Sequence, residues 1–277
     1  LALVAIFRDE APYLKEWIEF YRTIGVEHFY LHNHLSKDNY AEVLKTYIDE
    51  GVVTLSNVSV EAKDKVHWNK IQNSAYFSTI QEVKDKVEWL VIVDTDEFLF
   101  PVKEMSLANA LKEYDDYAGL AVNWRIFGSS NVKKIPSDKL LIETLVMKGD
   151  EKDTHVKSIV KPRYDEEMYN PHFPVFMKGY EKINENFEYF SGPFLPYESR
   201  HSFRINHYWS RDLEFFYNRK VSRVHVINNQ TSEGQAKAQI QVLIDQDKRN
   251  SSIYDGSILK YILITHNTKL ELAVYYS

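Results

Sequence analysis

The residues best placed to do chemistry are the carboxylates of the segment Asp94-Thr95-Asp96-Glu97. Five apolar residues precede the segment and three follow it, and a short run rich in Val and Ile is typical of a strand buried on both faces. The acids then fall at the carboxyl end of that strand, where open α/β sheets bind ligands. Two Asp side chains two residues apart suit a hard cation such as Mg²⁺ or Mn²⁺, which completes its shell with water and phosphate oxygens. The segment predicts a metal–diphosphate site; the alternative is that the acids only end a strand at solvent.

The elements that must position these acids alternate between strand and helix spacing. Pro12 suits a first helical turn, apolar residues follow at helical spacing, and Gly25 ends that helix. The expected order is strand 1–7, helix 12–24, strand 28–32, helix 40–48, strand 52–55, helix 69–83 and then the acidic strand. Such alternation implies a parallel sheet with right-handed crossovers.

Beyond the acids the pattern becomes less regular. We expect a short helix near 107–111, strands at 118–127 and 155–160, and a loop over the site at 170–176, which contains two Pro residues. A basic segment at 200–225 holds six Arg or Lys residues and three His residues against two acids. Contact with an anion and a solvated helix face are the two interpretations of that segment.

Composition excludes several classes of protein. The 277 residues are 44 % hydrophobic, which suffices for one large domain or two small ones. The net charge of −6 argues against a nucleic-acid partner. Cysteine is absent, which excludes disulfides and thiolate chemistry and fits a reducing compartment. No apolar run reaches the length of a membrane span, and segment 1–7 is too short and lacks a basic leader for a signal peptide.

Five motifs in order resemble glycosyltransferase family 92 and its relatives in the family 2 group. They lie at 5–17, 25–30, 94–98, 124–130 and 205–211. The resemblance implies a GT-A fold, which is a Rossmann-like, mostly parallel sheet with helices on both faces and an irregular α+β C-terminal half. Residues 1–130 would bind the nucleotide-sugar and residues 131–277 the acceptor. The implied reaction is inverting transfer of a hexose, expected to be galactose, from a UDP-sugar to a glycan or glycolipid with Mn²⁺ or Mg²⁺.

The resemblance and the residue types together suggest roles. The metal ligands are Asp94, Asp96 and His207, although His207 fits a packed histidine of an aromatic cluster equally well. The candidates for contact with the donor are Arg8, Asp9, Glu10, Asp94, Lys157, Arg211, Lys220 and Arg223. Asp9 or Glu10 could instead cap the following helix.

An inverting displacement needs a carboxylate to take the acceptor proton, and Glu198 and Asp165 are the candidates. Trp124 and Trp209 could stack on sugar rings or belong to the core. Two rival functions are an inactive carbohydrate-binding protein on the same fold and a phosphatase of the haloacid dehalogenase type. The absence of cysteine departs from eukaryotic relatives, so we expect a bacterial or viral, cytoplasmic protein, with or without attachment to the inner membrane face.

Overall fold

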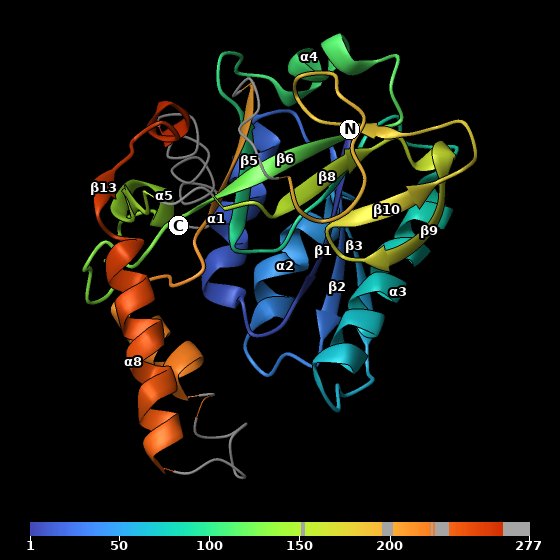
Figure 1. Cartoon of the computed structure of the whole chain (residues 1–277). Helices are drawn as coiled ribbons and strands as arrows, with labels where there is room; N and C mark the ends of the chain where they lie inside the picture. The colour runs from blue at the N-terminus through green and yellow to red at the C-terminus, as the bar shows by residue number, and fades with distance from the viewer. Residues whose placement is uncertain (151–152, 196–201, 223, 225–232, 263–277) are drawn as a thin grey trace. The chain divides into compact units, whose positions relative to one another are not determined.

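The computed structural model of the chain describes residues 1–150, 153–195, 202–222, 224 and 233–262 (Figure 1). The chain divides into two compact units that interleave in sequence. The first unit contains Leu1–Trp124 and Thr154–Ile205, and the second contains Arg125–Asp153 and Asn206–His266. Among the described residues, no helix is both long enough and apolar enough to cross a membrane.

The first unit opens with the predicted alternation of strands and helices. Its elements are β1 (Ala2–Phe7), α1 (Ala11–Thr23), β2 (His28–His34), α2 (Tyr40–Asp49), β3 (Val53–Val58), α3 (Lys65–Val83) and β4 (Leu90–Ile92). β1 pairs in parallel with both β2 and β4, and β2 pairs in parallel with β3. The order β3-β2-β1-β4 confirms the expected parallel half. The strand order changes sides between β1 and β4, which makes this gap the topological switch point of the sheet.

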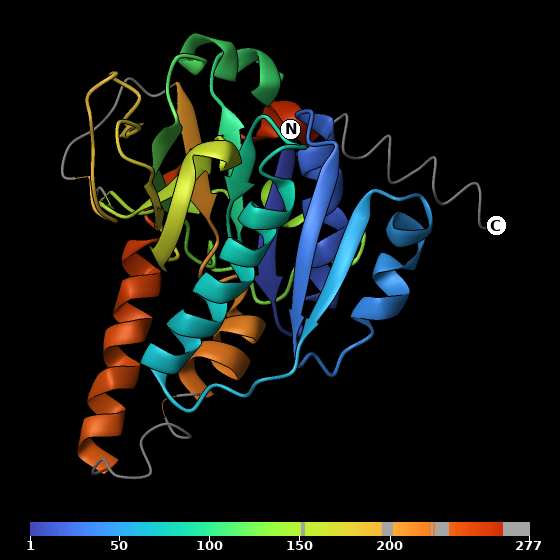
Figure 2. The ribbon, with the colours of Figure 1, turned by 90° about the vertical axis from the view of Figure 1, so that its right-hand side faces the viewer.

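The helices cover both faces of this parallel sheet. Alternate residues of β1 and β4, including Val4 and Ile92, form one buried cluster with α3. On the other face, Trp17 of α1 lies against Phe29 of β2, with ring centroids 5.9 Å apart. Figure 2 shows α3 and α2 on opposite sides of the strands. Gly25 ends the α1 region at a φ of 103°, a backbone conformation that suits glycine.

Further strands extend the sheet with mixed direction. They are β5 (Glu97–Pro101), β6 (Gly119–Ile126), β8 (Val156–Val160), β11 (Lys182–Ile183) and β12 (Phe203–His207). β8 is antiparallel to both β4 and β6, and the path ends β4-β8-β6-β12-β5. The short helices of this unit are α4 (Leu107–Leu111), η1 (Lys112–Tyr114) and η2 (Pro162–Tyr164).

The segment expected as a loop at 170–176 belongs to a hairpin. β9 (Asp165–Asn170) pairs antiparallel with β10 (Phe173–Phe176), so the loop prediction was wrong. The hairpin is a two-stranded sheet of its own, and Pro174 therefore lies on an edge strand, where proline is tolerated.

The second unit is smaller and contains the long helix near the C-terminus, α8 (Glu233–Arg249). Its other elements are α5 (Leu141–Thr144), β7 (Met147–Lys148), α6 (Leu213–Phe215), η3 (Phe216–Val221), β13 (Ile253–Tyr254) and η4 (Leu259–Tyr261). The side chain of Asp247 on α8 accepts hydrogen bonds from the backbone N–H and the hydroxyl of Ser129, at 2.8 and 2.7 Å. Gly128 is tightly enclosed there, because an added Cβ would lie 2.2 Å from Ser251 Oγ.

Candidate active site

The acidic segment forms a tight turn between two strands. β4 ends at Ile92, and β5 begins at Glu97, whose carboxylate accepts a hydrogen bond of 2.9 Å from the backbone N–H of Asp94. The acids therefore do follow a buried strand, as predicted. The apolar residues after them, however, belong to a separate strand at the far end of the sheet path. The turn contains neither Gly nor Pro, so the sequence did not predict a turn between two strands at this point.

Asp94 is held by side chains from two other elements. Its Oδ1 accepts hydrogen bonds from Gln72 Nε2 at 2.9 Å and from Tyr76 Oη at 2.8 Å. Its Oδ2 accepts one from Lys157 Nζ at 2.9 Å. Gln72 and Tyr76 are four residues apart on α3 and so share one face of that helix. The sequence analysis had not singled out either residue.

Lys157 is a buried counter-ion for two acids. Its side chain is fully buried, and Nζ lies 2.9 Å from Asp94 Oδ2 and 3.7 Å from Glu97 Oε2. β8 brings it there, because the antiparallel register pairs Ile92 with Ser158, the next residue of β8. A side chain without exposed surface cannot reach a diphosphate. We therefore correct its expected role from donor contact to counter-ion.

The pKa values of this cluster shift in different directions. Burial is the largest single effect and on its own would raise the pKa of Asp94, but the charge and hydrogen bond of Lys157, together with the hydrogen bond of Tyr76, lower that pKa overall. Burial raises the pKa of Glu97 well above its usual range, and Asp94 and Asp96 add to that effect. Burial would lower the pKa of Lys157, but Asp94 and Glu97 raise it. The cluster therefore holds an Asp94–Lys157 ion pair next to Glu97, whose pKa is raised chiefly by burial.

The residues present could bind a divalent cation only if the substrate supplied some of the ligands. Among the described residues, no group of three or more His, Cys, Asp or Glu side chains could hold a metal ion. Both oxygens of Asp94 already accept hydrogen bonds. Asp96 is half-buried in the same turn. Because Mg²⁺ is commonly bound by one or two carboxylates together with substrate phosphates, the site fits a cation that arrives with a diphosphate.

Arg8, Asp9 and Glu10 lie at the carboxyl end of β1, the strand next to β4. Arg8 is exposed, and Asp9 has a left-handed φ of 56° with its Oδ1 accepting the backbone N–H of Lys37 at 2.7 Å. Neither Asp9 nor Glu10 caps α1. Instead, Asp38 accepts the backbone N–H of Ala11 at 2.8 Å, a cap from the loop after β2 that sequence alone did not reveal.

A cavity of about 560 Å³ opens beside the acid cluster, on the next face of α3. It lies between α3 and the carboxyl-terminal halves of β2 and β3, and its polar lining consists of His32, Ser56, Asn57, His67, Lys70, Ser74 and Ser78. Burial lowers the pKa of His32 to about 4, and its Nε2 lies 2.8 Å from the hydroxyl of Thr79. His32 is therefore neutral at pH 7.

Two residues of the first unit that were predicted to contact the substrate are buried. Trp124 is 9 % exposed and stacks on His155 at 4.9 Å, which corresponds to the core alternative rather than to sugar stacking. Asp165 is 5 % exposed at the start of β9, and neither carboxylate oxygen has a hydrogen-bond partner. Burial raises the pKa of Asp165 well above its usual range, and the charge of Lys182 opposes that rise.

The predicted residues of the second unit form a local aromatic and basic group. Lys220 Nζ lies 4.8 Å from the ring centroid of Trp209, and the Arg211 guanidinium lies 5.8 Å from that of Phe215. Arg211 is buried, and His207 is buried at the end of β12. Glu198 and Arg223 lie outside the described residues. His207 and Arg211 therefore do not belong to a solvated helix face, whereas Arg219 and Lys220 of η3 are half-exposed.

The parallel sheet with acids at its switch point defines an α/β protein with a Rossmann-like half. The chain belongs to glycosyltransferase family 92, whose family model matches residues 4–232. This match confirms the family expected from the sequence motifs, and the predicted class of enzyme is the class of that family. Together with the sheet topology, it gives the chain the expected GT-A type of α/β fold.

Individual relatives are distant and longer. A glycosyltransferase family 92 protein of Ricinus communis is 27 % identical over 167 residues, which are 58 % of this chain and 28 % of that protein. A family 92 protein of Oryza sativa subsp. japonica is 26 % identical over 139 residues, 49 % of this chain and 23 % of that protein. The chain thus spans less than a third of these relatives. S. aureus TarS (1–349) in complex with UDP-GlcNAc aligns over 88 % of this chain and 71 % of its own, at 12 % identity and a TM-score of 0.39.

Proposed function

We propose that this chain transfers a hexose from a UDP-sugar to a hydroxyl of a glycan or glycolipid with inversion, and that galactose is the first sugar to test. The observation that carries the proposal is the Asp94–Lys157–Glu97 cluster. It lies at the carboxyl end of β4, beside β1, in a chain of a glycosyltransferase family. This is the edge of an α/β sheet where nucleotides bind.

The charges of the cluster suit a metal-bound diphosphate. Lys157 offsets the charge of Asp94, and burial raises the pKa of Glu97, so we assign the cation to Asp96, the half-buried acid of the same turn. We expect Mn²⁺ or Mg²⁺ to be held by Asp96 and the donor phosphates. When bound, the cation supplies positive charge that stabilises the leaving diphosphate. Gln72, Tyr76 and Lys157 keep the turn in one conformation through their hydrogen bonds to Asp94.

The nucleoside of the donor fits the cavity beside α3. Ile71 and Ala75, which line that cavity, are the chain neighbours of Gln72 and Tyr76, which contact Asp94. The cavity is therefore adjacent to the acid cluster through α3. Asn57 and Ser56 offer hydrogen-bond partners for a base or ribose, and Lys70 adds positive charge.

In the reaction, the acceptor oxygen forms a bond to the anomeric carbon while the bond from that carbon to the diphosphate oxygen breaks. The acceptor proton passes to a carboxylate, and UDP leaves. Glu198 and Asp165 stay candidates for that carboxylate.

Calorimetric titration with UDP, with and without Mn²⁺, tests the donor site. We expect UDP to bind only with the metal, and Asp96→Asn to weaken that binding at least tenfold while unfolding as the parent does. Asp85→Asn is the matched control, because Asp85 is an exposed acid between α3 and β4, at the opposite end of β4. Equal UDP affinity in Asp96→Asn and the parent would refute the proposal.

Of the two alternative functions, the phosphatase is disfavoured by the hydrogen bonds that Asp94 accepts. Its mechanism needs the first Asp as a nucleophile, whereas both oxygens of Asp94 accept hydrogen bonds. The inactive binding protein predicts the same UDP affinity as the transferase but no UDP release in the presence of any glycan.

A further inference from the structure

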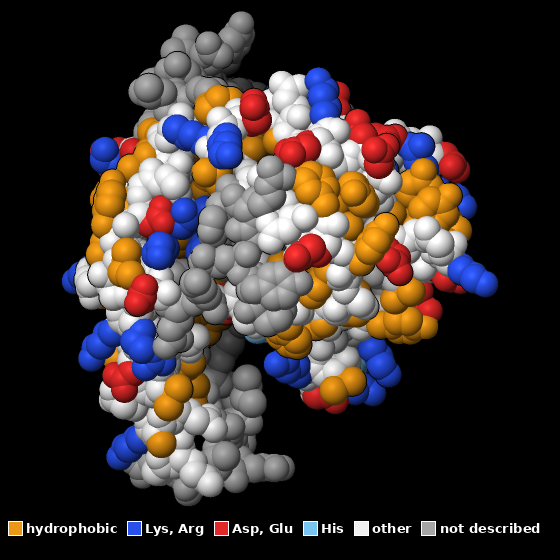
Figure 3. All heavy atoms as spheres, turned by 45° about the horizontal axis from the view of Figure 1, so that its top comes forward, with side chains coloured by type: hydrophobic (Ala, Val, Ile, Leu, Met, Phe, Trp, Pro, Cys, Tyr) orange, Lys and Arg blue, Asp and Glu red, His pale blue; other side chains and the backbone are white. Residues whose placement is uncertain are grey.

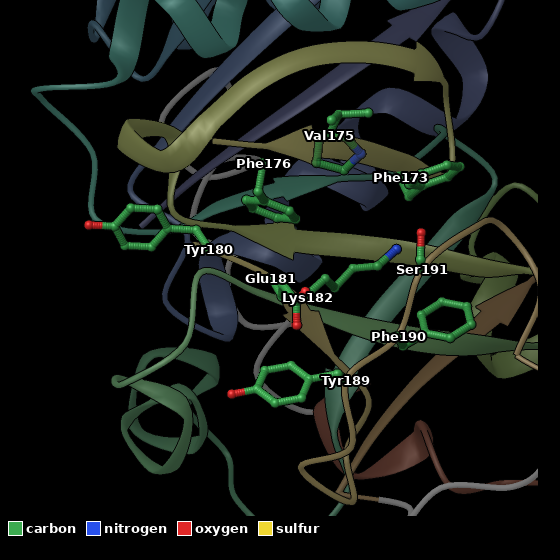
Figure 4. A pocket seen from close by; sticks show the side chains of 10 residues that line it. Phe173, Val175, Phe176, Tyr180, Glu181, Lys182, Tyr189, Phe190 and Ser191 are labelled. Atoms are coloured by element: carbon green, nitrogen blue, oxygen red, sulfur yellow. The ribbon is translucent and has the colours of Figure 1, made fainter. Parts of the chain in front are cut away.

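The first unit contains a second pocket that the donor site does not use. It has a volume of about 270 Å³ and lies between β10 and residues 180–191 (Figure 4). Its aromatic lining consists of Phe173, Phe176, Tyr180, Tyr189 and Phe190. Glu181 and Ser191 are the exposed polar residues of the lining.

A buried lysine joins two walls of this pocket. Lys182 Nζ lies 5.0 Å from the ring centroid of Phe173 and 4.9 Å from that of Phe190, and it donates a 3.3 Å hydrogen bond to Ser158 Oγ. The side chain is 2 % exposed, and burial lowers the pKa of Lys182 to about 7. The packing of its stem and amine between Phe173 and Phe190 holds both rings in place before any ligand binds.

The rim of the pocket exposes aromatic surface to solvent. Tyr189 is 69 % exposed and Tyr180 is 44 % exposed. The Tyr180 ring is nevertheless fixed, because it stacks on Tyr164 with centroids 4.1 Å apart and an interplanar angle of 16°. Of the twelve exposed large hydrophobic residues among those described, five lie between positions 169 and 194. Hydrophobic side chains form patches among charged ones on the face shown in Figure 3.

We propose that this pocket binds one ring of a neutral glycan, as a glycan-binding subsite separate from the acid cluster. The apolar C–H face of a sugar ring packs on fixed aromatic rings, and Glu181 and Ser191 offer acceptors and a donor for its hydroxyl groups. The carboxylate of Glu181 repels acidic sugars, which selects neutral ones. The choice of ligand class rests on the proposed transferase function.

Two neighbouring residues of β8 contact the pocket lining and the acid cluster. Ser158 contacts Lys182 beneath the pocket, whereas Lys157 contacts Asp94. The lining of the pocket contains none of the acids at 94–97. We therefore assign the pocket to another ring of the acceptor glycan than the ring whose hydroxyl group reacts.

Binding to an array of neutral and acidic oligosaccharides tests the proposal. The parent should bind at least one neutral glycan, and Tyr189→Ala should weaken that binding about tenfold, the loss expected for an aromatic contact. Tyr169→Ala is the matched control, because Tyr169 is 66 % exposed on β9 and does not line the pocket. It should bind within twofold of the parent.

Three outcomes would overturn the subsite: no neutral glycan bound, acidic glycans bound in preference, or equal losses in both tyrosine variants. UDP affinity with Mn²⁺ is measured in the same samples and should be unchanged in Tyr189→Ala. If the parent binds glycan but not UDP, the transferase proposal is refuted and the subsite is not.

Discussion

Replacing Lys157 by methionine would leave the Asp94 carboxylate without its buried counter-ion. Breaking a buried ion pair by removing one partner typically costs about 3–5 kcal/mol. The Asp94 side chain is 30 % exposed, so water screens part of this loss and we expect about 3 kcal/mol. Urea unfolding at pH 7 measures the change in the free energy of unfolding. Lys45→Met is the control, because the Lys45–Asp49 pair lies exposed on α2 and is worth about 1 kcal/mol or less.

The pH dependence checks the electrostatic cause of this loss. In the parent, the pKa of Asp94 is lowered, so its ionisation stabilises the fold above the unfolded pKa and this stability is lost as the pH falls through the folded pKa. Without Lys157, burial raises the pKa of Asp94. The difference in stability between Lys157→Met and the parent should therefore shrink as the pH falls from 7 toward 4.

A second substitution separates lost charge pairing from lost packing. Adding Asp94→Asn to Lys157→Met removes the unpaired charge and should recover at least about 1 kcal/mol. A double variant that is less stable than Lys157→Met would refute the ion-pair reasoning. So would a loss in Lys157→Met no larger than that in Lys45→Met.

Two further predictions concern buried polar groups. The pKa of His32 is about 4 in the folded chain and about 6.5 when unfolded, so the unfolded state binds more protons between these values and stability falls as the pH drops through that window. His32→Gln should remove about 2–3 kcal/mol of the loss between pH 7 and 4.5 in urea unfolding, and identical pH profiles would contradict this. Asp247→Ala removes both acceptors of Ser129 and should destabilise the chain by about 2–3 kcal/mol, whereas Asp245→Ala on the same helix should change stability by less than about 0.5 kcal/mol. Equal thermal midpoints for these two variants would contradict the buried role of Asp247.

Local patterns predicted the parallel half of the fold well. The apolar stripe of residues 11–23 and the glycines at 25 and 51 mark helices and their ends through short-range spacing, and the structure places those elements as expected. The hairpin at 165–176 was missed because two Pro residues look like a loop. An isolated edge strand tolerates Pro, which sequence alone cannot show.

The partners inside the site depend on long-range pairing. Lys157 meets Asp94 from 63 positions away because β8 inserts antiparallel beside β4. The side chain of Asp38, rather than that of Glu10, accepts the backbone N–H of Ala11 at the start of α1, because the loops after β1 and β2 come together. No periodicity encodes either contact. The acids at 94–97 were recognisable as a candidate site, whereas Lys157, which neutralises Asp94, was expected to face the donor.

The central claim is that the acids at the end of β4 support metal-assisted transfer from a UDP-sugar. The most direct measurement follows UDP release from UDP-galactose and other UDP-sugars with Mn²⁺ and a mixture of glycan acceptors, together with the product linkage by NMR. The account predicts acceptor-dependent release with a β-linked product from an α-linked donor, and a loss of at least about a hundredfold in Asp96→Asn. An α-linked product, or undiminished turnover by Asp96→Asn, would contradict it.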